Sequence, residues 1–302
     1  MQDIVRIFCE VDDFCKVFER YCNQRITLLP SKNGSKAKKI SFCHSKQLSL
    51  SEVMTITIYF HLSHYRTFKH YYNEYVKKQL KAYFPRLVSY NRFVELMQEA
   101  LFPLIVYTQK ARLGKCSGIS FIDSTTLDVC HNRRIHNHKV FEGIATRGKS
   151  STGWFYGFKL HITINECGEI LSFYLTDAAT DDRNENVIDV LTKNLYGKLF
   201  GDKGYLSAKL FERLYDRGIQ LFTKLKSNMK NKLIRLEDKL LLRKRAVIES
   251  VNDFLKNVCQ IEHTRHRSFA NFCTNLVAGI AAYSFLPKKP SITDRFALGL
   301  GS

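Results

Sequence analysis

Three acidic residues lie far apart in the chain, and each has a local setting of a different kind. Asp123 ends the apolar run GISFID, Asp202 follows the run KLFG, and Glu249 lies within the helical-looking segment RKRAVIESVNDFLK. Carboxylate oxygens are the ligands that Mg²⁺ prefers in proteins. Two such ions about 4 Å apart can activate an attacking oxygen and stabilise a leaving one. The three residues together therefore predict a metal site for phosphodiester chemistry.

Each of the three acids also has a plainer interpretation. Asp123 could cap a turn, Asp202 lies between two glycines in typical turn chemistry, and Glu249 could pair with Arg245 one helical turn away. The plain interpretation is weakest for Asp123, because an ionised carboxylate beside Ile122 is costly to bury without a cation. We interpret Asp123 as the carboxylate that bridges the two ions, and the hypothesis depends on the three acids as a set.

The apolar patterning predicts the elements that would position these acids. Strands are expected over 119–123, 154–165, 170–175, 198–200 and 220–223, and helices over 184–194, 207–217 and 237–258. Three strands with a hairpin link, followed by helix, strand, helix, strand and helix, is the order of a ribonuclease H-like core. The expected fold class is therefore a mixed α/β sheet with Asp123 on its first strand and Asp202 just past the fourth.

The expected helix at 237–258 places Glu249 on a polar face. One apolar stripe follows the helical period and comprises Val247, Ile248, Val251, Phe254, Leu255 and Val258. Steps of four, three and four residues place Arg245, Glu249, Asn252 and Lys256 together on the opposite face. A lone helix of this kind would simply be solvated on that face, but the two upstream aspartates favour a functional role for Glu249.

The chain divides into two parts at a linker expected over 111–118. The first part, residues 1–110, is expected to be helical and to bind DNA. Helices at 66–84 and from the N-cap Ser89 onward resemble a helix-turn-helix pair that would present Asn91, Arg92 and Glu95 to a groove. The second part, residues 118–302, is expected to be the ribonuclease H-like catalytic domain.

The composition indicates a polyanionic partner. The chain has 302 residues, a formal net charge of +19 and 45% apolar residues, and such an excess of positive charge is typical of nucleic-acid-binding proteins. Between Lys203 and Arg267 there are 16 Lys or Arg against 7 Asp or Glu. The expected DNA contacts are Lys203, Arg243, Lys244, Arg245 and Lys256, together with Arg92. The N-terminus lacks a signal-peptide pattern and the apolar run 276–286 is too short to span a bilayer, so a cytoplasmic location and no membrane partner are expected.

Two other motifs point to different chemistry. Residues 143–150 fit G-x4-G-K-S, the phosphate-binding loop of nucleotide hydrolases, but that loop must lead into a helix. The glycines and aromatics at 153–157 predict a strand instead, so we interpret 143–150 as a flexible basic loop. Cysteines and histidines near residues 43–64 and 130–138 could be assembled into zinc sites, but neither group has a standard ligand spacing.

With the three acids in place, the chain resembles the DDE transposases of bacterial insertion sequences, most closely the insertion-sequence-982 family. The resemblance covers nearly the whole length. Its most specific segments are 120–125, 153–161, 200–205 and the tail from 261–267 through 282–285. Related transposases carry a Y-x2-R-x3-E-x6-K signature, which Arg245, Glu249 and Lys256 match, whereas Leu242 stands at the tyrosine position.

The resemblance implies a function that composition alone does not. The protein would cleave the ends of its element to leave 3′-hydroxyls and join them to target DNA, using two Mg²⁺ ions, with Mn²⁺ as a substitute, held by Asp123, Asp202 and Glu249. Its partners would be the terminal inverted repeats and target DNA, bound by a homodimer or larger assembly in the nucleoid of a bacterial cell. The alternatives are a nuclease of the same fold without strand transfer, and a catalytically silent DNA-binding descendant of a transposase.

Overall fold

The computed structural model describes residues 4–27, 42, 47–150, 153–224, 234–262 and 266–292, and it divides into two compact units. The helical unit comprises 1–112, 258–261 and 266–283, and the sheet unit comprises 113–257, 262–265 and 284–302. The basic stretch at 31–39, residues 151–152, and residues 263–265 of the tail lie outside the described residues.

The helical unit is built from α-helices interrupted by two π-helical segments. Its elements are α1 (Ile4–Thr27), α2 (Leu50–Phe60), α3 (Phe68–His70), η1 (Tyr71–Val76), α4 (Lys77–Gln79), α5 (Tyr90–Glu99), α6 (Leu101–Tyr107), η2 (Thr108–Arg112) and α11 (Phe269–Phe285). The single helix expected at 66–84 is thus three consecutive pieces with a π-helical centre. Ser89 is the N-cap of α5, as expected, and its hydroxyl accepts a hydrogen bond from the amide of Arg92 at 3.3 Å.

The C-terminal helix α11 belongs to the helical unit. The sequence-based division had grouped it with residues 118–302, but the structure groups nearly all of it with the first 112 residues. The Thr274 hydroxyl donates to the carbonyl of Met97 at 3.2 Å, and residues 276–278 and 280–282 of α11 are buried. An apolar segment of this kind joins whichever core can cover it, which position in the sequence does not determine.

The sheet unit contains one mixed six-stranded sheet. Its strands are β1 (Ile119–Cys130), β2 (Thr146–Ser150), β3 (Gly153–Asn165), β4 (Ile170–Asp177), β5 (Gly197–Gly201) and β6 (Ile219–Thr223). The order is β2-β3-β1-β5-β6, with β4 also paired to β3. Pairs made by β3 are antiparallel, whereas β1, β5 and β6 run parallel. Without β2, this is the ribonuclease H-like order, with β1 in mid-sheet.

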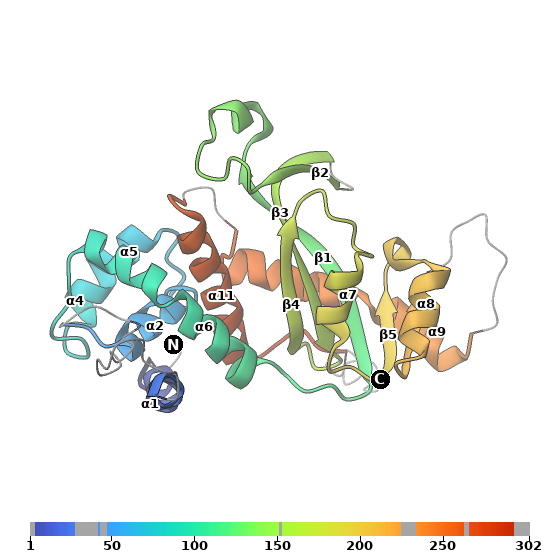
Figure 1. Ribbon diagram of the computed structural model, residues 1–302, viewed down its shortest axis with the longest axis horizontal. Helices are drawn as coiled ribbons and strands as arrows, with labels where there is room; N and C mark the ends of the chain where they lie inside the picture. Colours follow the sequence, from blue (N-terminus) through green and yellow to red (C-terminus); the bar gives the residue numbers. More distant parts are fainter. Residues whose placement is uncertain are drawn as a thin grey trace, which may run out of the picture. The chain divides into compact units, whose positions relative to one another are not determined.

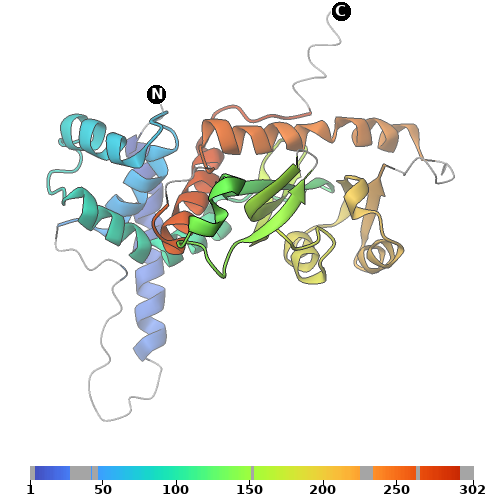
Figure 2. The same cartoon turned by 90° about the horizontal axis from the view of Figure 1, so that it is seen from above.

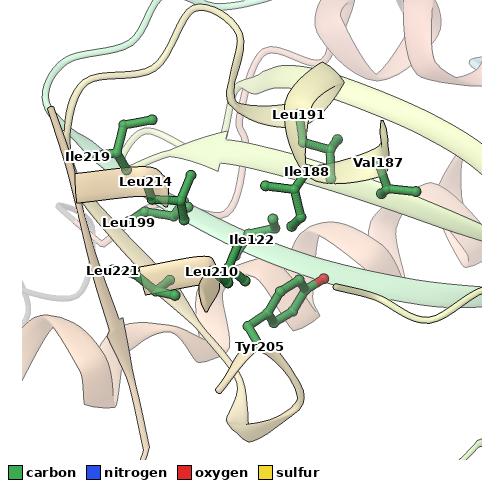
Figure 3. Packing of buried hydrophobic residues seen from close by; sticks show 10 residues of the cluster. All are labelled: Ile122, Val187, Ile188, Leu191, Leu199, Tyr205, Leu210, Leu214, Ile219 and Leu221. Carbon is green, nitrogen blue, oxygen red and sulfur yellow. The ribbon is translucent and has the colours of Figure 1, made fainter. Parts of the chain in front are cut away.

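Helices cover both faces of this sheet (Figure 2). On one face, α7 (Glu185–Thr192) and α8 (Ala208–Tyr215) pack an apolar cluster against β1, β5 and β6, and Figure 3 shows its members Ile122, Leu191 and Leu210 together. On the other face lie α9 (Leu236–Lys244) and α10 (Ala246–Asp253), which continue into the π-helical η5 (Phe254–Val258). The short 3-10 helices η3 (Asn132–Asn137) and η4 (Lys203–Tyr205) complete the unit.

Three sequence-based boundaries differ from the structure. β1 extends seven residues past Asp123, and residues 146–150, expected to be a flexible loop, form strand β2 (Figure 1). The helix expected over 237–258 is interrupted by a turn at Arg245, between α9 and α10. A glycine is needed within β2, because a Cβ at residue 148 would come 2.4 Å from the carbonyl oxygen of Ala178.

Candidate active site

Asp123 and Asp202 lie side by side on adjacent parallel strands. In the pairing of β1 with β5, Phe121 is opposite Phe200. Each aspartate comes two residues after its phenylalanine, so both lie at the same level, one within β1 and the other just past the end of β5. Neighbouring parallel strands thus bring together two carboxylates that are 79 residues apart in the sequence.

The third acid, Glu249, lies on helix α10, and the guanidinium of Arg245 is close to all three acids. Nη2 of Arg245 lies 2.7 Å from Oε1 of Glu249 and 3.7 Å from Oδ1 of Asp202, and Nη1 lies 3.8 Å from Oδ2 of Asp123. The i to i+4 ion pair of the plain interpretation is therefore present, but the same guanidinium also faces the two strand-borne aspartates. Three carboxylates from three elements surround one buried positive charge.

The three carboxylates differ in solvent access. The side chain of Asp123 is 20% exposed, against 48% for Asp202 and 58% for Glu249, and that of Arg245 is 9% exposed. Burial raises the pKa of Asp123 to about 6; the Arg245 guanidinium lowers it, whereas the Glu249 and Asp202 carboxylates raise it further. Asp123 is thus the acid whose charge depends most on a cation close by.

Three polar atoms around the carboxylates are buried without a hydrogen-bond partner. They are Nη1 of Arg245, Oδ1 of Asn252 and the hydroxyl of Tyr205. Asn252 also donates from Nδ2 to Oδ2 of Asp123 at 3.5 Å. In Figure 3, the Tyr205 ring packs in the apolar cluster with its hydroxyl at the margin. Such groups are uncommon in folded proteins, and these three retain hydrogen-bonding capacity for a further polar partner.

The donor set fits a divalent metal, although the side chains are arranged around a guanidinium. Within the described residues, no three Asp, Glu, His or Cys groups are close enough to hold a metal ion as they stand. Nitrogens of Arg245 lie 2.7 to 3.8 Å from an oxygen of each of the three carboxylates. Hard oxygen donors that gather around one cation are the chemistry that Mg²⁺ requires. The cysteine and histidines at 130–138 form no such cluster, and Cys43 and His44 of the other candidate zinc grouping lie outside the described residues.

Comparison with known families identifies the fold. A family model described as the transposase DDE domain matches residues 113–269, which is just over half of the chain. The chain belongs to the DDE transposase family. Among solved structures, it is similar to a piggyBac transposase in a synaptic complex with hairpin DNA, determined by cryo-electron microscopy, with a TM-score of 0.51 and 10% identity over 99% of this chain and 79% of that one. A comparison with curated proteins gives no match.

These findings support the ribonuclease H-like fold class expected from the strand order. The family match begins at the linker and covers β1 through the start of α11, so it includes all three candidate acids. At 10% identity, the structural similarity concerns the fold alone. In the described residues of the transposase, no helix is long and apolar enough to cross a membrane.

The expected DNA contacts have different settings in the transposase. Lys203 and Arg243 are exposed and Lys244 is partly buried. Lys256 pairs with Glu262 at 3.1 Å, and Arg92 pairs with Glu95 at 2.6 Å and Glu99 at 3.6 Å. Arg245 differs most from expectation, because it is buried among the candidate metal ligands and turned away from solvent. The sequence showed that cations surround Glu249, but it did not show which of them folds inward.

A second polar cluster on the opposite sheet face was not recognised from the sequence. Oδ1 of Asp182 accepts from the Ser124 hydroxyl at 3.0 Å and lies 3.3 Å from Nζ of Lys159 and 3.8 Å from Nδ1 of His161. Ser124 directly follows Asp123, so Asp182 fixes the strand position next to that acid. Lys159 and His161 fall within the motif at 153–161, which was the available signal. Asp182 lies in a loop whose sequence gives no comparable sign.

The nucleotide-hydrolase motif has no phosphate-binding structure in this transposase. Gly148, Lys149 and Ser150 lie in strand β2, which pairs with β3 and is not followed by a helix. A phosphate-binding loop depends on the N-terminal amides of a helix directly after it. The structure therefore supports the rejection of nucleotide hydrolysis. The prediction of a flexible loop is wrong for residues 146–150, which form β2.

Proposed function

We propose that this protein is a DNA transposase that cleaves phosphodiester bonds at the ends of its element and joins the 3′-hydroxyl ends to target DNA. One observation carries the proposal: Asp123, Asp202 and Glu249, from β1, the end of β5 and α10, converge on the Arg245 guanidinium. In a chain of the DDE transposase family, such a convergence of carboxylates suits divalent metal ions and a phosphate substrate.

Asp123, Asp202 and Glu249 would hold two Mg²⁺ ions, or Mn²⁺ in their place. When bound, these ions would activate the attacking oxygen and stabilise the leaving oxygen of the phosphodiester. Asp123, held at mid-sheet and least exposed of the three, is suited to bridge both ions. Asn252 orients its carboxylate through the 3.5 Å contact, and Tyr205 offers a hydroxyl at the margin of the site. Burial raises the pKa of Tyr205 well above its usual value, so this hydroxyl remains a donor.

The finer assignment rests on the sequence motifs. We assign the chain to the insertion-sequence-982 group of bacterial transposases, acting in the nucleoid. Its partners are the terminal inverted repeats, recognised by the helical unit through α5 and Arg92, and the target DNA. A homodimer or larger assembly would hold two ends together. Cations near the site, the exposed Lys203 and Arg243 and the partly buried Lys244, are suited to the DNA backbone.

The deciding experiment replaces Asp123 with Asn, which keeps the shape and removes the charge. Cleavage and joining of a supercoiled donor plasmid that carries the element ends should fall to background in Mg²⁺, while binding of the ends stays close to wild type. Asp216→Asn, at the exposed C-cap of α8, is the matched control and should keep full activity. Mg²⁺-dependent joining by Asp123→Asn would rule out the proposed site.

The same assay separates the two rival functions. A nuclease of this fold would cut the donor but give no inserted product. A catalytically silent DNA-binding descendant would bind the ends, cut nothing, and show no metal binding that depends on Asp123, Asp202 and Glu249. Calorimetric Mg²⁺ titration of wild type and the three single Asn or Gln variants therefore completes the test.

A further inference from the structure

A basic arm extends from the sheet unit between β1 and the start of β3. We define it as residues 131–150 and 153–154, which include η3 and β2, and Figure 1 shows it reaching beyond the end of β4. Residues 131–150 carry five Lys or Arg residues and a single carboxylate, Glu142. The candidate active site does not use this arm.

The hairpin register gathers three exposed side chains on one face of the arm. Lys149 is directly opposite Trp154, and Arg147 lies two residues before Lys149 on the same strand. Because side chains alternate between the faces of a strand, Arg147, Lys149 and Trp154 share one face. Gly148 and Phe155 point to the other face, where both are buried. The Lys149 ammonium lies 5.9 Å from the centre of the Trp154 ring.

The segment around η3 adds two further cations beside the tryptophan. Nδ2 of Asn132 donates to the carbonyl of Trp154 at 2.6 Å, so the start of η3 is tied to this residue. Arg133 and Arg134 follow directly and are exposed. No carboxylate in the described part of the chain forms an ion pair with Arg133, Arg134, Arg147 or Lys149, whereas both cations of α8, Lys209 and Arg213, have such partners.

Trp154 is the only tryptophan of the chain, and 64% of it is exposed. A large aromatic side chain with this exposure does not belong to a hydrophobic core and is accessible to a ligand. An exposed indole with the Lys149 ammonium near its ring, and with further exposed cations in the same arm, matches a nucleotide, because the base stacks on the ring and the phosphates meet the cations. Bases inside a duplex are already stacked on one another, so the indole needs a base that is free of the helix.

We propose that the basic arm binds single-stranded DNA, with Trp154 stacked on an unpaired base and with Arg133, Arg134, Arg147 and Lys149 against the flanking phosphates. The choice of DNA as the polyanion rests on the proposed function. The arm itself is a separate surface, since it contributes none of the three carboxylates. Its substrate is therefore a stretch of unpaired strand, as at an opened or cut DNA end.

The single tryptophan makes the test direct. The full-length protein is titrated with a short oligothymidine and with a blunt duplex annealed from two complementary strands while tryptophan emission is followed. The oligothymidine should quench Trp154 strongly, and the blunt duplex should quench it little. Trp154→Ala should weaken oligothymidine binding, measured by fluorescence anisotropy of labelled DNA, by about 5- to 150-fold. Trp154→Phe, which keeps a stacking face, should restore most of the affinity.

A matched control and a second variant complete the design. Tyr215 on α8 is also 64% exposed and belongs to the same unit, so Tyr215→Ala should leave oligothymidine binding unchanged. Arg133→Gln with Arg147→Gln should make the log-log salt dependence of oligothymidine binding shallower by about 0.7 per lost contact. Equal affinity of Trp154→Ala and wild type, or equal quenching by the blunt duplex, would overturn the inference while leaving the proposed function intact. Failure of the wild-type chain to bind any DNA would overturn both.

Discussion

Arg245 is the residue on which the electrostatics of the candidate site depend. Its side chain is 9% exposed and is shared by three carboxylates, of which two are about half exposed. A buried cation in this position offsets the repulsion between the acids in the metal-free protein. If the three carboxylates hold divalent ions, as proposed, the guanidinium and the metal should compete for the same oxygens.

This competition predicts the behaviour of Arg245→Gln. Without divalent ions, the variant should be less stable than wild type by roughly 1–3 kcal/mol, because the carboxylates lose their counter-charge. Added Mg²⁺ should raise its melting temperature by more than it raises that of wild type, since no guanidinium has to leave. Differential scanning calorimetry with and without Mg²⁺ measures both effects. Arg243→Gln, which alters an exposed cation of α9, is the control, and equal Mg²⁺ increments in all three proteins would contradict the competition.

His161 gives a second prediction at the residue scale. It is fully buried, its Nε2 meets the Thr176 hydroxyl at 2.9 Å, and burial lowers its pKa to about 4, with Asp182 opposing and Lys159 assisting the shift. The unfolded chain takes up this proton below pH about 6.5, whereas the folded chain does not. His161 therefore removes stability as the pH falls from about 6.5 to about 4, by up to about 3 kcal/mol.

A His161→Gln variant isolates this effect, because Asp123 acts in the opposite direction. The raised pKa of Asp123, about 6, makes the folded protein take up a proton first and gain stability over much of the same range. Comparison of the variant with wild type cancels the Asp123 contribution. In urea denaturation followed by circular dichroism, the stability advantage of wild type over the variant should shrink between about pH 7.5 and about pH 4.5. A constant difference would show that His161 does not stay neutral in the folded protein.

At the scale of elements, the pairing of β1 with β3 supports both the acids and the basic arm. Asp123 is opposite Ile162 near the middle of the pair, and Gly157 is opposite Asp128 where the strands approach the arm. A Cβ at residue 157 would come 2.0 Å from the carbonyl oxygen of Leu127. Only a glycine permits this approach of the two backbones.

Gly157→Ala should therefore destabilise the sheet unit by about 1–3 kcal/mol or more, since the clash is with backbone and not with a side chain that can move. Gly204→Ala is the matched control, because its new Cβ would meet only Oδ2 of Asp182 at 3.9 Å. Chemical denaturation of both variants makes the comparison. A Gly157→Ala protein as stable as Gly204→Ala would mean that β1 and β3 separate here at little cost.

The elements also show what the sequence could predict and what it could not. The apolar runs before Asp123 and Asp202 identified two strands. Because these strands are parallel neighbours in the sheet, the acids at corresponding positions on them lie close together. The turn at Arg245 had no such signal: the stripe of Val247, Val251 and Leu255 continues a helix pattern on one side of it only. Which cation folds onto the acids is decided by tertiary packing, which periodicity does not encode.

β2 shows a different limit of the sequence. The nucleotide-binding motif without a helix after it suggested a flexible basic loop, but Gly148 is required by the close approach of Ala178. A glycine in a strand indicates either a flexible backbone or the close approach of another backbone segment, and only the packing of the neighbouring segment distinguishes the two. The helix α11 was similarly apolar enough to be noticed, yet its membership of the helical unit depends on a partner surface distant in the sequence.

For the whole molecule, the net charge of +19 is less concentrated around the acids than the sequence suggests. Several cations between residues 203 and 267 already have carboxylate partners: Lys209, Arg213 and Arg217 pair with Glu185 or Asp189, and Lys256 pairs with Glu262. Exposed Lys203 and Arg243, and the cations of the basic arm, contribute charge that is more available to phosphate.

Binding of the element ends should consequently be strongly salt-dependent. Each neutralised phosphate contributes about −0.9 to the slope of log affinity against log salt for duplex DNA, so several contacts give a steep line. Asp123→Asn should keep the wild-type slope, because under the proposed function that carboxylate would hold metal ions and would not contact the DNA backbone, whereas Lys203→Gln with Arg243→Gln should flatten the slope by up to about 1.8. Fluorescence anisotropy across a salt series gives these slopes. A nearly flat dependence of log affinity on log salt for wild type would mean that the excess positive charge contributes to solubility and does not bind the DNA backbone.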